Sequence, residues 1–209
     1  KLFSYPNYVG TIQSFVDKFL AIPYYCKLIG HKPIRIDNEI FFEQFEFEMD
    51  RKYFFALNKK FHNKWEDPIL KLSHYEAQGL ILNEEIISKY LGFSPKTTTY
   101  KKIVKCKKSL FDKGFLNFYD AFTLAFSFTD QIDNIKNLIK QRFSYVFVDE
   151  MQDMEQHQYN LLEILFNNST SIYQRIGDKN QAIYGSLSNE QNKEDFWIDR
   201  DKVLTLCGS

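Results

Sequence analysis

A short apolar run that ends in two carboxylates constrains the fold of this 209-residue chain more than any other feature. Residues 145–148, YVFV, are continuous, apolar and rich in β-branched and aromatic side chains. A strand buried on both faces has this composition, so we expect a central strand of a parallel sheet. Ligands of such sheets bind beyond the carboxyl ends of the strands, where Asp149 and Glu150 follow. One carboxylate there can hold Mg²⁺ while its neighbour orients or deprotonates a water.

A second polar loop follows at the spacing of a β-α-β unit. Apolar residues centred on Leu161, Leu162 and Leu165 predict a helix, and residues 171–176 predict another strand. A right-handed crossover would bring the two strands into one parallel sheet. The second strand leads into GDKNQAIY, residues 177–184, so we expect both loops at one edge of the sheet.

The loop DEMQD, residues 149–153, and the loop after the second strand resemble the second and third motifs of the UvrD/Rep/PcrA-type superfamily 1 DNA helicases. Met151 stands where the family usually has alanine, and Ala182 where it usually has serine. VGTIQSF, residues 9–15, resembles the family's Thr-Phe-His-Ser element, and GFLNFYD, residues 114–120, resembles the segment that re-enters the motor core. The resemblance implies an ATP-dependent helicase or translocase that uses ATP and Mg²⁺. It also implies 3′-to-5′ movement on single-stranded or partly duplex DNA.

The resemblance gives each polar residue of the two loops a role in nucleotide chemistry. Asp149 would bind Mg²⁺, and Glu150 would be the catalytic base that aims the water. Gln181 would sense the γ-phosphate and act in catalysis, since an amide offers donors and an acceptor without adding charge. Gln152 and Asp178 would contribute to nucleotide binding.

Three further residues would belong to the DNA side by the same resemblance: Thr11, Gln13 and Tyr184. In the family the third motif continues as Trp-Arg-Gly-Ala, which provides an aromatic ring for a base to stack on, whereas SLS, residues 186–188, follows here. Tyr184 either supplies that ring or packs against the sheet. Thr11 and Gln13 either begin a helix that binds a phosphate or act only at a helix N-cap.

The resemblance and the periodicity together predict an α/β fold in two parts. Residues 1–22 and 114–209 would form part of a RecA-like parallel-sheet motor domain of the P-loop NTPase type, and residues 23–113 a mainly helical inserted domain. Apolar spacing predicts helices from Thr11 to a stop at Pro23, through most of residues 40–57, from Asn83 to Leu91, and around residues 118–126 and 132–139. The lysine-rich residues 101–108 would be either a solvated helix face or a surface for DNA phosphates.

One element of such a motor is missing from the chain. No glycine is followed by lysine, so the loop Gly-x-x-x-x-Gly-Lys-Thr/Ser that cradles phosphates is absent. The last residues, KVLTLCGS, resemble the strand before the family's fourth motif. We therefore expect an internal fragment of a longer helicase that is inactive without the phosphate loop and second motor domain of its remainder.

Composition leaves two rival functions open. Lys+Arg and Asp+Glu balance at 27 each, so any DNA-binding surface must be local. Three cysteines without metal-ligand spacing indicate reduced thiols in a cytoplasmic protein, and no apolar run is long enough to span a membrane. The rivals are a non-catalytic DNA-binding or scaffold protein that lacks a phosphate loop, and a metal nuclease that uses the carboxylates Asp149, Glu150, Asp153 and Asp178.

Overall fold

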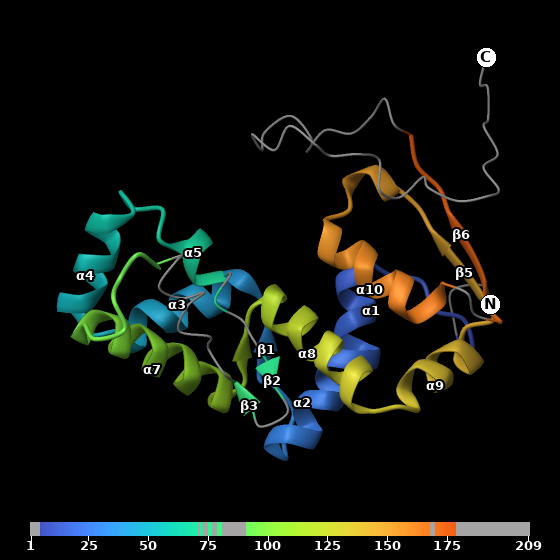
Figure 1. Ribbon diagram of the computed structural model, residues 1–209, viewed down its shortest axis with the longest axis horizontal. Coiled ribbons are helices and arrows are strands. Elements are labelled where there is room, and N and C mark those ends of the chain that lie inside the picture. The colour runs from blue at the N-terminus through green and yellow to red at the C-terminus, as the bar shows by residue number, and fades with distance from the viewer. Residues whose placement is uncertain are drawn as a thin grey trace. The chain divides into compact units, whose positions relative to one another are not determined.

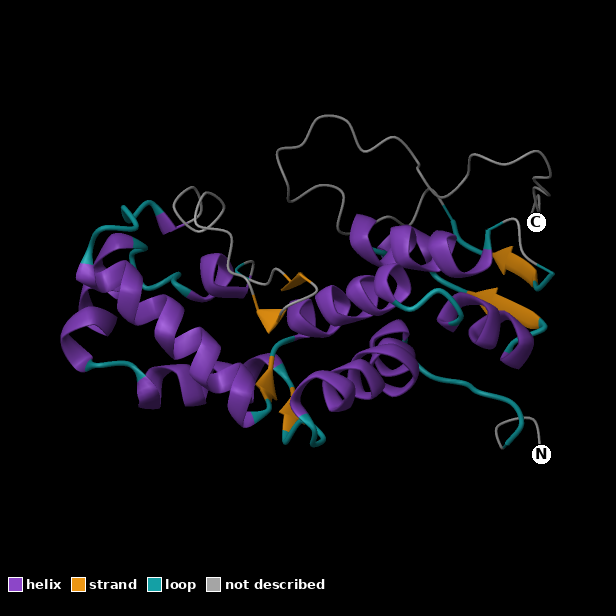
Figure 2. Cartoon of the chain, turned by 60° about the horizontal axis from the view of Figure 1, so that its bottom comes forward, coloured by secondary structure: helices purple, strands orange, loops and turns teal. Residues whose placement is uncertain are grey.

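The computed structural model describes residues 5–70, 72, 75–76, 79–80, 91–167 and 170–178 (Figure 1). The chain divides into two compact units, Lys1–Asp133 and Asn134–Ser209. Helices dominate both, and the described strands form three pairs (Figure 2). Two of these pairs are parallel and one is antiparallel, which makes the fold a helix-rich member of the α/β class. None of the described helices is long and apolar enough to cross a membrane.

The first unit begins with one helical run in three segments: α1 (Ile12–Val16), the π-helix η1 (Asp17–Ala21) and α2 (Ile22–Ile29). The prediction that Pro23 ends this helix is wrong. Pro23 lies in the first turn of α2, directly after the π-helical segment where the hydrogen-bond register changes. Proline inside a helical run removes one i→i−4 hydrogen bond, and the change of register directly before Pro23 lets the helix continue.

The middle of the first unit is a block of four described α-helices: α3 (Asn38–Glu48), α4 (Arg51–Lys60), α5 (Glu66–Leu70) and α7 (Thr98–Lys113). The prediction of mostly helix in residues 40–57 is confirmed, with a break at Met49 and Asp50. A small antiparallel pair joins β2 (Tyr75–Glu76) to β3 (Gly79–Leu80). Of the helix predicted from Asn83 to Leu91, only Leu91 lies within the described residues. The block has its own core, which contains Phe41, Phe45, Met49, Leu57, Trp65, Ile69, Leu72, Leu91, Tyr100, Ile103, Cys106 and Leu110.

Two adjacent parallel strands connect this block to the rest of the unit. The chain enters through β1 (Arg35–Ile36) and leaves through β4 (Phe115–Leu116) into α8 (Phe118–Gln131). Helix α8 contacts α1, η1 and α2, so α2 packs with the segments predicted for the motor domain. The domain boundary placed before residue 23 stays a prediction.

Gly114 holds the two connecting strands close together. Its φ is +91°, and a Cβ at this position would lie 2.7 Å from the backbone nitrogen of Ile34 and 3.1 Å from Cα of Pro33. We expect Gly114→Ala to lower the free energy of unfolding by about 1–3 kcal/mol, the usual cost of a strained backbone conformation. Urea unfolding of the chain measures this loss.

Gly30 provides the matched control. It has the same φ of +91°, but apart from its immediate chain neighbours no heavy atom of the described residues lies within 4 Å of a Cβ built there. Gly30→Ala therefore carries the backbone strain alone, and Gly114→Ala should cost more. Equal losses would contradict a role for the close approach of Gly114 to Pro33 and Ile34.

A buried ion pair joins the helical block to α8. Lys107 Nζ lies 2.8 Å from Asp120 Oδ2, and both side chains are fully buried. Asp120 Oδ2 also accepts a hydrogen bond from the backbone N–H of Asn117, whose side chain caps α8. Burial lowers the pKa of Lys107, while the Asp120 carboxylate acts in the opposite direction. For Lys107 both readings of the lysine-rich segment are wrong, because this side chain meets neither solvent nor DNA.

The second unit contains the predicted β-α-β motif. After α9 (Ile135–Arg142) come β5 (Tyr145–Val148), the 3₁₀-helix η2 (Met151–Asp153), α10 (Gln156–Phe166) and β6 (Ile172–Arg175). Strands β5 and β6 are parallel, with Tyr145 opposite Ile172 and Val148 opposite Arg175. This confirms the predicted order and direction of the two strands.

The prediction that β5 is buried on both faces is wrong for the described chain. Tyr145 and Phe147 are 66% and 61% exposed, while the alternate residues of β5 are half-buried. Helix α10 covers only one face of the pair: Arg175 donates a hydrogen bond to the Tyr159 hydroxyl at 2.8 Å, and Tyr173 contacts the ring of Phe166. The other face presents Tyr145, Phe147 and Ile172 together with Gln174 and is not covered by described residues. An apolar run predicts burial without specifying what packs on it.

Candidate functional site

The two predicted site carboxylates follow β5 in a tight turn. Glu150 has φ +54° and ψ +41°, a left-handed conformation that is uncommon for a residue with a side chain. Its backbone N–H donates to Asp149 Oδ1 at 3.0 Å, and its carbonyl accepts from the N–H of Asp153, also at 3.0 Å. Both carboxylates are exposed at the end of the strand. Strained conformations of this kind concentrate at ligand and active sites, which supports the site predicted here.

Backbone contacts bring the second predicted loop beside the first. The N–H of Ile176 donates to the carbonyl of Val148 at 2.8 Å, and the N–H of Met151 donates to the carbonyl of Ile176 at 3.0 Å. The Met151 side chain is fully buried. Methionine, which stands here in place of the family's usual alanine, therefore buries a larger apolar side chain at this turn. The residues on either side of Met151 are thereby held at the edge of the sheet.

The Gln152 side chain makes the remaining link between the loops. Its Nε2 donates to Glu150 Oε2 at 2.5 Å, and its Oε1 accepts the backbone N–H of Asp178 at 3.0 Å. Asp149, Glu150, Gln152 and the backbone of Asp178 thus belong to one connected site. Gln181 was predicted for the same site, but it lies outside the described residues.

The predicted carboxylates do not form a multi-ligand metal cluster. Among the described residues, no group of three or more histidine, cysteine, aspartate or glutamate side chains is arranged to hold a metal ion. The residues proposed for a metal nuclease are all described and all exposed. A single aspartate at a strand end remains a suitable Mg²⁺ ligand when phosphates and water complete the shell.

The DNA-side residues of the first unit make hydrogen bonds within their own helix. Thr11 caps α1, with Oγ1 accepting from the N–H of Ser14 at 3.1 Å. Gln13 Nε2 donates to Asp17 Oδ1 at 2.7 Å. The structural role of Thr11 as an N-cap is thus present, and the DNA contacts of Thr11 and Gln13 stay predictions. Tyr184, the third DNA-side residue, lies outside the described residues.

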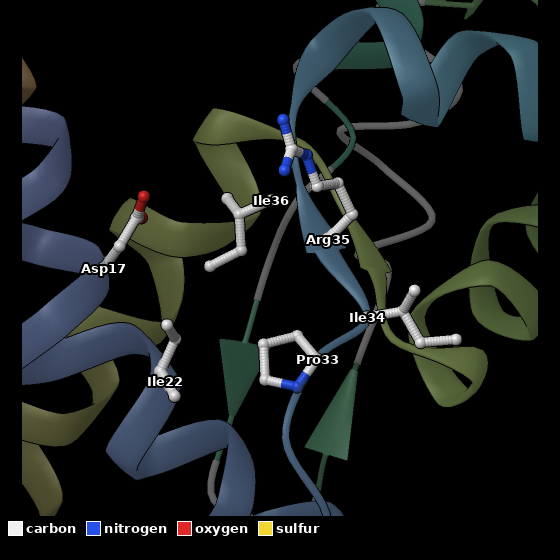
Figure 3. Close-up of a pocket in the computed structure, with 6 residues that line it drawn as sticks. All are labelled: Asp17, Ile22, Pro33, Ile34, Arg35 and Ile36. Carbon is white, nitrogen blue, oxygen red and sulfur yellow. The ribbon is translucent and has the colours of Figure 1, made fainter.

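Sequence reasoning missed Asp17, which lines a pocket of about 210 Å³ together with Ile22, Pro33, Ile34, Arg35 and Ile36 (Figure 3). Burial raises the pKa of Asp17 to about 6, and the hydrogen bond from Gln13 acts in the opposite direction. The i, i+4 spacing of Gln13 and Asp17 on a predicted helix was the available signal.

Comparison with known proteins identifies the family of the chain. Residues 11–190 match the family model of the UvrD/REP helicase N-terminal domain. A probable DNA helicase II homolog of Mycoplasma genitalium is 27% identical over 182 residues, which are 84% of this chain and 25% of that protein. The ATP-dependent DNA helicase PcrA of Staphylococcus epidermidis is 30% identical over 92 residues, 44% of this chain and 12% of PcrA. The RecB subunit of the RecBCD enzyme of Buchnera aphidicola is 32% identical over 73 residues, 34% of this chain and 6% of RecB.

The chain therefore spans a quarter or less of the length of these curated relatives. The family match nevertheless covers most of the chain and includes both loops of the candidate site. With the parallel β-α-β unit, the paired carboxylates after β5 and the match over residues 11–190, the chain belongs to the UvrD/Rep helicase N-terminal domain family.

Proposed function

We propose that this chain is part of the motor of an ATP-dependent DNA helicase that couples Mg²⁺-ATP hydrolysis to 3′-to-5′ movement on single-stranded DNA. The observation that best supports this is the joined pair of loops at the end of β5 and β6. There Glu150 is held by Gln152, and Gln152 in turn holds the backbone of Asp178. Such a link between a base and a second loop suits a motor that must respond to its nucleotide.

The chemistry assigns each residue of this site a task. Asp149 would hold Mg²⁺, because an exposed carboxylate after a parallel strand suits a hard cation that keeps several waters. Glu150 would accept a proton from the attacking water. Gln181 would approach the γ-phosphate, and Mg²⁺ would neutralise charge on the phosphates when nucleotide is bound.

The proposed motor domain is a partial RecA-like sheet of the P-loop NTPase type, formed by residues 1–22 and 114–209, with residues 23–113 as the inserted helical domain. The distinct core of the helical block supports this division. These 209 residues contain no Gly-Lys pair, so the residues named above would supply only the metal and water side of the nucleotide site. We propose that the chain alone hydrolyses no ATP, and that its DNA substrate and sparse cysteines favour a cytoplasmic location.

The missing Gly-Lys pair also favours a second candidate, a non-catalytic DNA-binding protein. One assay on the full-length gene product separates the two: Mg²⁺-dependent ATP hydrolysis with and without single-stranded DNA. We expect DNA to stimulate hydrolysis, and duplexes with a 3′ tail to be unwound in preference to those with a 5′ tail. DNA binding without ATP hydrolysis would favour the scaffold, and DNA cleavage without ATP would favour the nuclease.

A further inference from the structure

Both the amide nitrogen and the amide oxygen of Gln152 make hydrogen bonds within the protein. The donor, Nε2, faces Glu150 Oε2, and the acceptor, Oε1, faces the N–H of Asp178. An amide suits this position because it carries a donor group and an acceptor on one carbon without a net charge. A carboxylate could make only the second contact, and an ammonium group only the first.

Gln152 adds a side-chain contact to the backbone hydrogen bonds that join the two loops. Backbone hydrogen bonds join the loops at Val148, Met151 and Ile176, where the strands end. The buried side chain of Met151 fixes the backbone just before Gln152. Past that point, the backbone N–H of Asp178 donates a hydrogen bond to Gln152 and so joins the loops again.

We propose that Gln152 is a positioning residue that orients the Glu150 carboxylate and ties that orientation to the loop beginning at Gly177. The resemblance predicted a direct role for Gln152 in nucleotide binding, whereas its amide here is committed to two protein groups. The inference rests on the proposed role of Glu150 as the base. A displacement of Asp178 would release the Gln152 acceptor, and the orientation of Glu150 would be lost with it.

The effect on catalysis should exceed the effect on stability. Gln152 is only half-buried and its partners are exposed, so its hydrogen bonds contribute about 0.5–1.5 kcal/mol each to folding. A misplaced catalytic group, in contrast, can cost about 10²-fold in rate for a shift on the order of 1 Å. A large loss of rate together with a small loss of folding stability would therefore identify a positioning role.

The first experiment needs no nucleotide. Amide hydrogen exchange at Asp178 is measured in the 209-residue chain and in Gln152→Met, which keeps the side-chain length but removes both hydrogen bonds. We expect exchange at Asp178 to become about tenfold faster, the loss of roughly one hydrogen bond. Gln152→Glu should restore slow exchange because it keeps an acceptor. Gln156→Met, an exposed glutamine on α10, is the matched control and should change nothing at Asp178. Unchanged exchange in Gln152→Met would overturn the link.

The second experiment uses the full-length protein. Gln152→Met should lower kcat for ATP by about 10- to 100-fold with little change in KM, consistent with a misplaced base. In a Glu150→Ala background the same change should have little further effect, because Gln152 acts through Glu150. A raised KM with unchanged kcat, or additive effects in that background, would overturn the positioning role. If Glu150→Ala itself leaves hydrolysis unchanged, the proposed function fails. The exchange experiment would still test the hydrogen bond between Asp178 and Gln152.

Discussion

Replacing Glu150 with glutamine should lower ATP hydrolysis by the full-length protein by about 10²- to 10⁴-fold, the range typical of losing a general base. The amide keeps the size of the side chain and can still contact Gln152, but it cannot accept the proton of the attacking water. Nucleotide and Mg²⁺ binding should change little, since Asp149 is the proposed metal ligand. Steady-state hydrolysis and equilibrium binding of a nucleotide analogue measure the two quantities separately.

Glu155→Gln is the matched control for this substitution. Glu155 is also exposed and lies at the N-cap of α10, so the same chemical change is made close by without touching the proposed base. Its rate should stay near that of the unmodified protein. Near-normal hydrolysis by Glu150→Gln would show that another group activates the water, and the assignment of the β5 loop would fail at its central residue.

Replacing Lys107 with methionine should lower the free energy of unfolding by about 3–5 kcal/mol, the usual cost of leaving one member of a buried ion pair without its partner. Lys107 contacts Asp120 at 2.8 Å and lies 4.2 Å from the centre of the Phe41 ring, so the substitution keeps the packing but removes the charge. Asp120 would then be a buried carboxylate opposite an apolar chain. Urea unfolding followed by circular dichroism measures the loss.

Two further variants test that explanation. Lys108→Met removes an exposed lysine next in sequence and should change stability by about 0.5 kcal/mol or less, as surface substitutions usually do. Asp120→Asn added to Lys107→Met should recover part of the lost stability, because it removes the unpaired charge while its amide oxygen can still accept the N–H of Asn117. A loss below about 1 kcal/mol for Lys107→Met alone would mean that the pair contributes no more than a surface bridge.

Local sequence features determined much of the candidate site. The apolar run at residues 145–148, the helix around Leu161 and the strand around residue 172 depend on short-range periodicity, and the structure has all three in the predicted order. The placement of Asp149 and Glu150 at a strand end follows directly from that order. Gln152 was assigned to the site by resemblance, but its contact with Asp178 spans 26 residues and has no local signature.

What the sequence by itself determined was the strand-helix-strand order of the second unit, the family and the identity of the loop that carries the carboxylates, because these depend on neighbours within a few residues. The tertiary structure alone decided that Lys107 is buried, that the helix continues past Pro23, that the described residues cover one face of β5 and that Gln152 joins two loops. Each of these depends on a partner distant in sequence or on a change of hydrogen-bond register. Composition and periodicity state which surfaces are apolar or polar, whereas only the packed chain determines which group each surface meets.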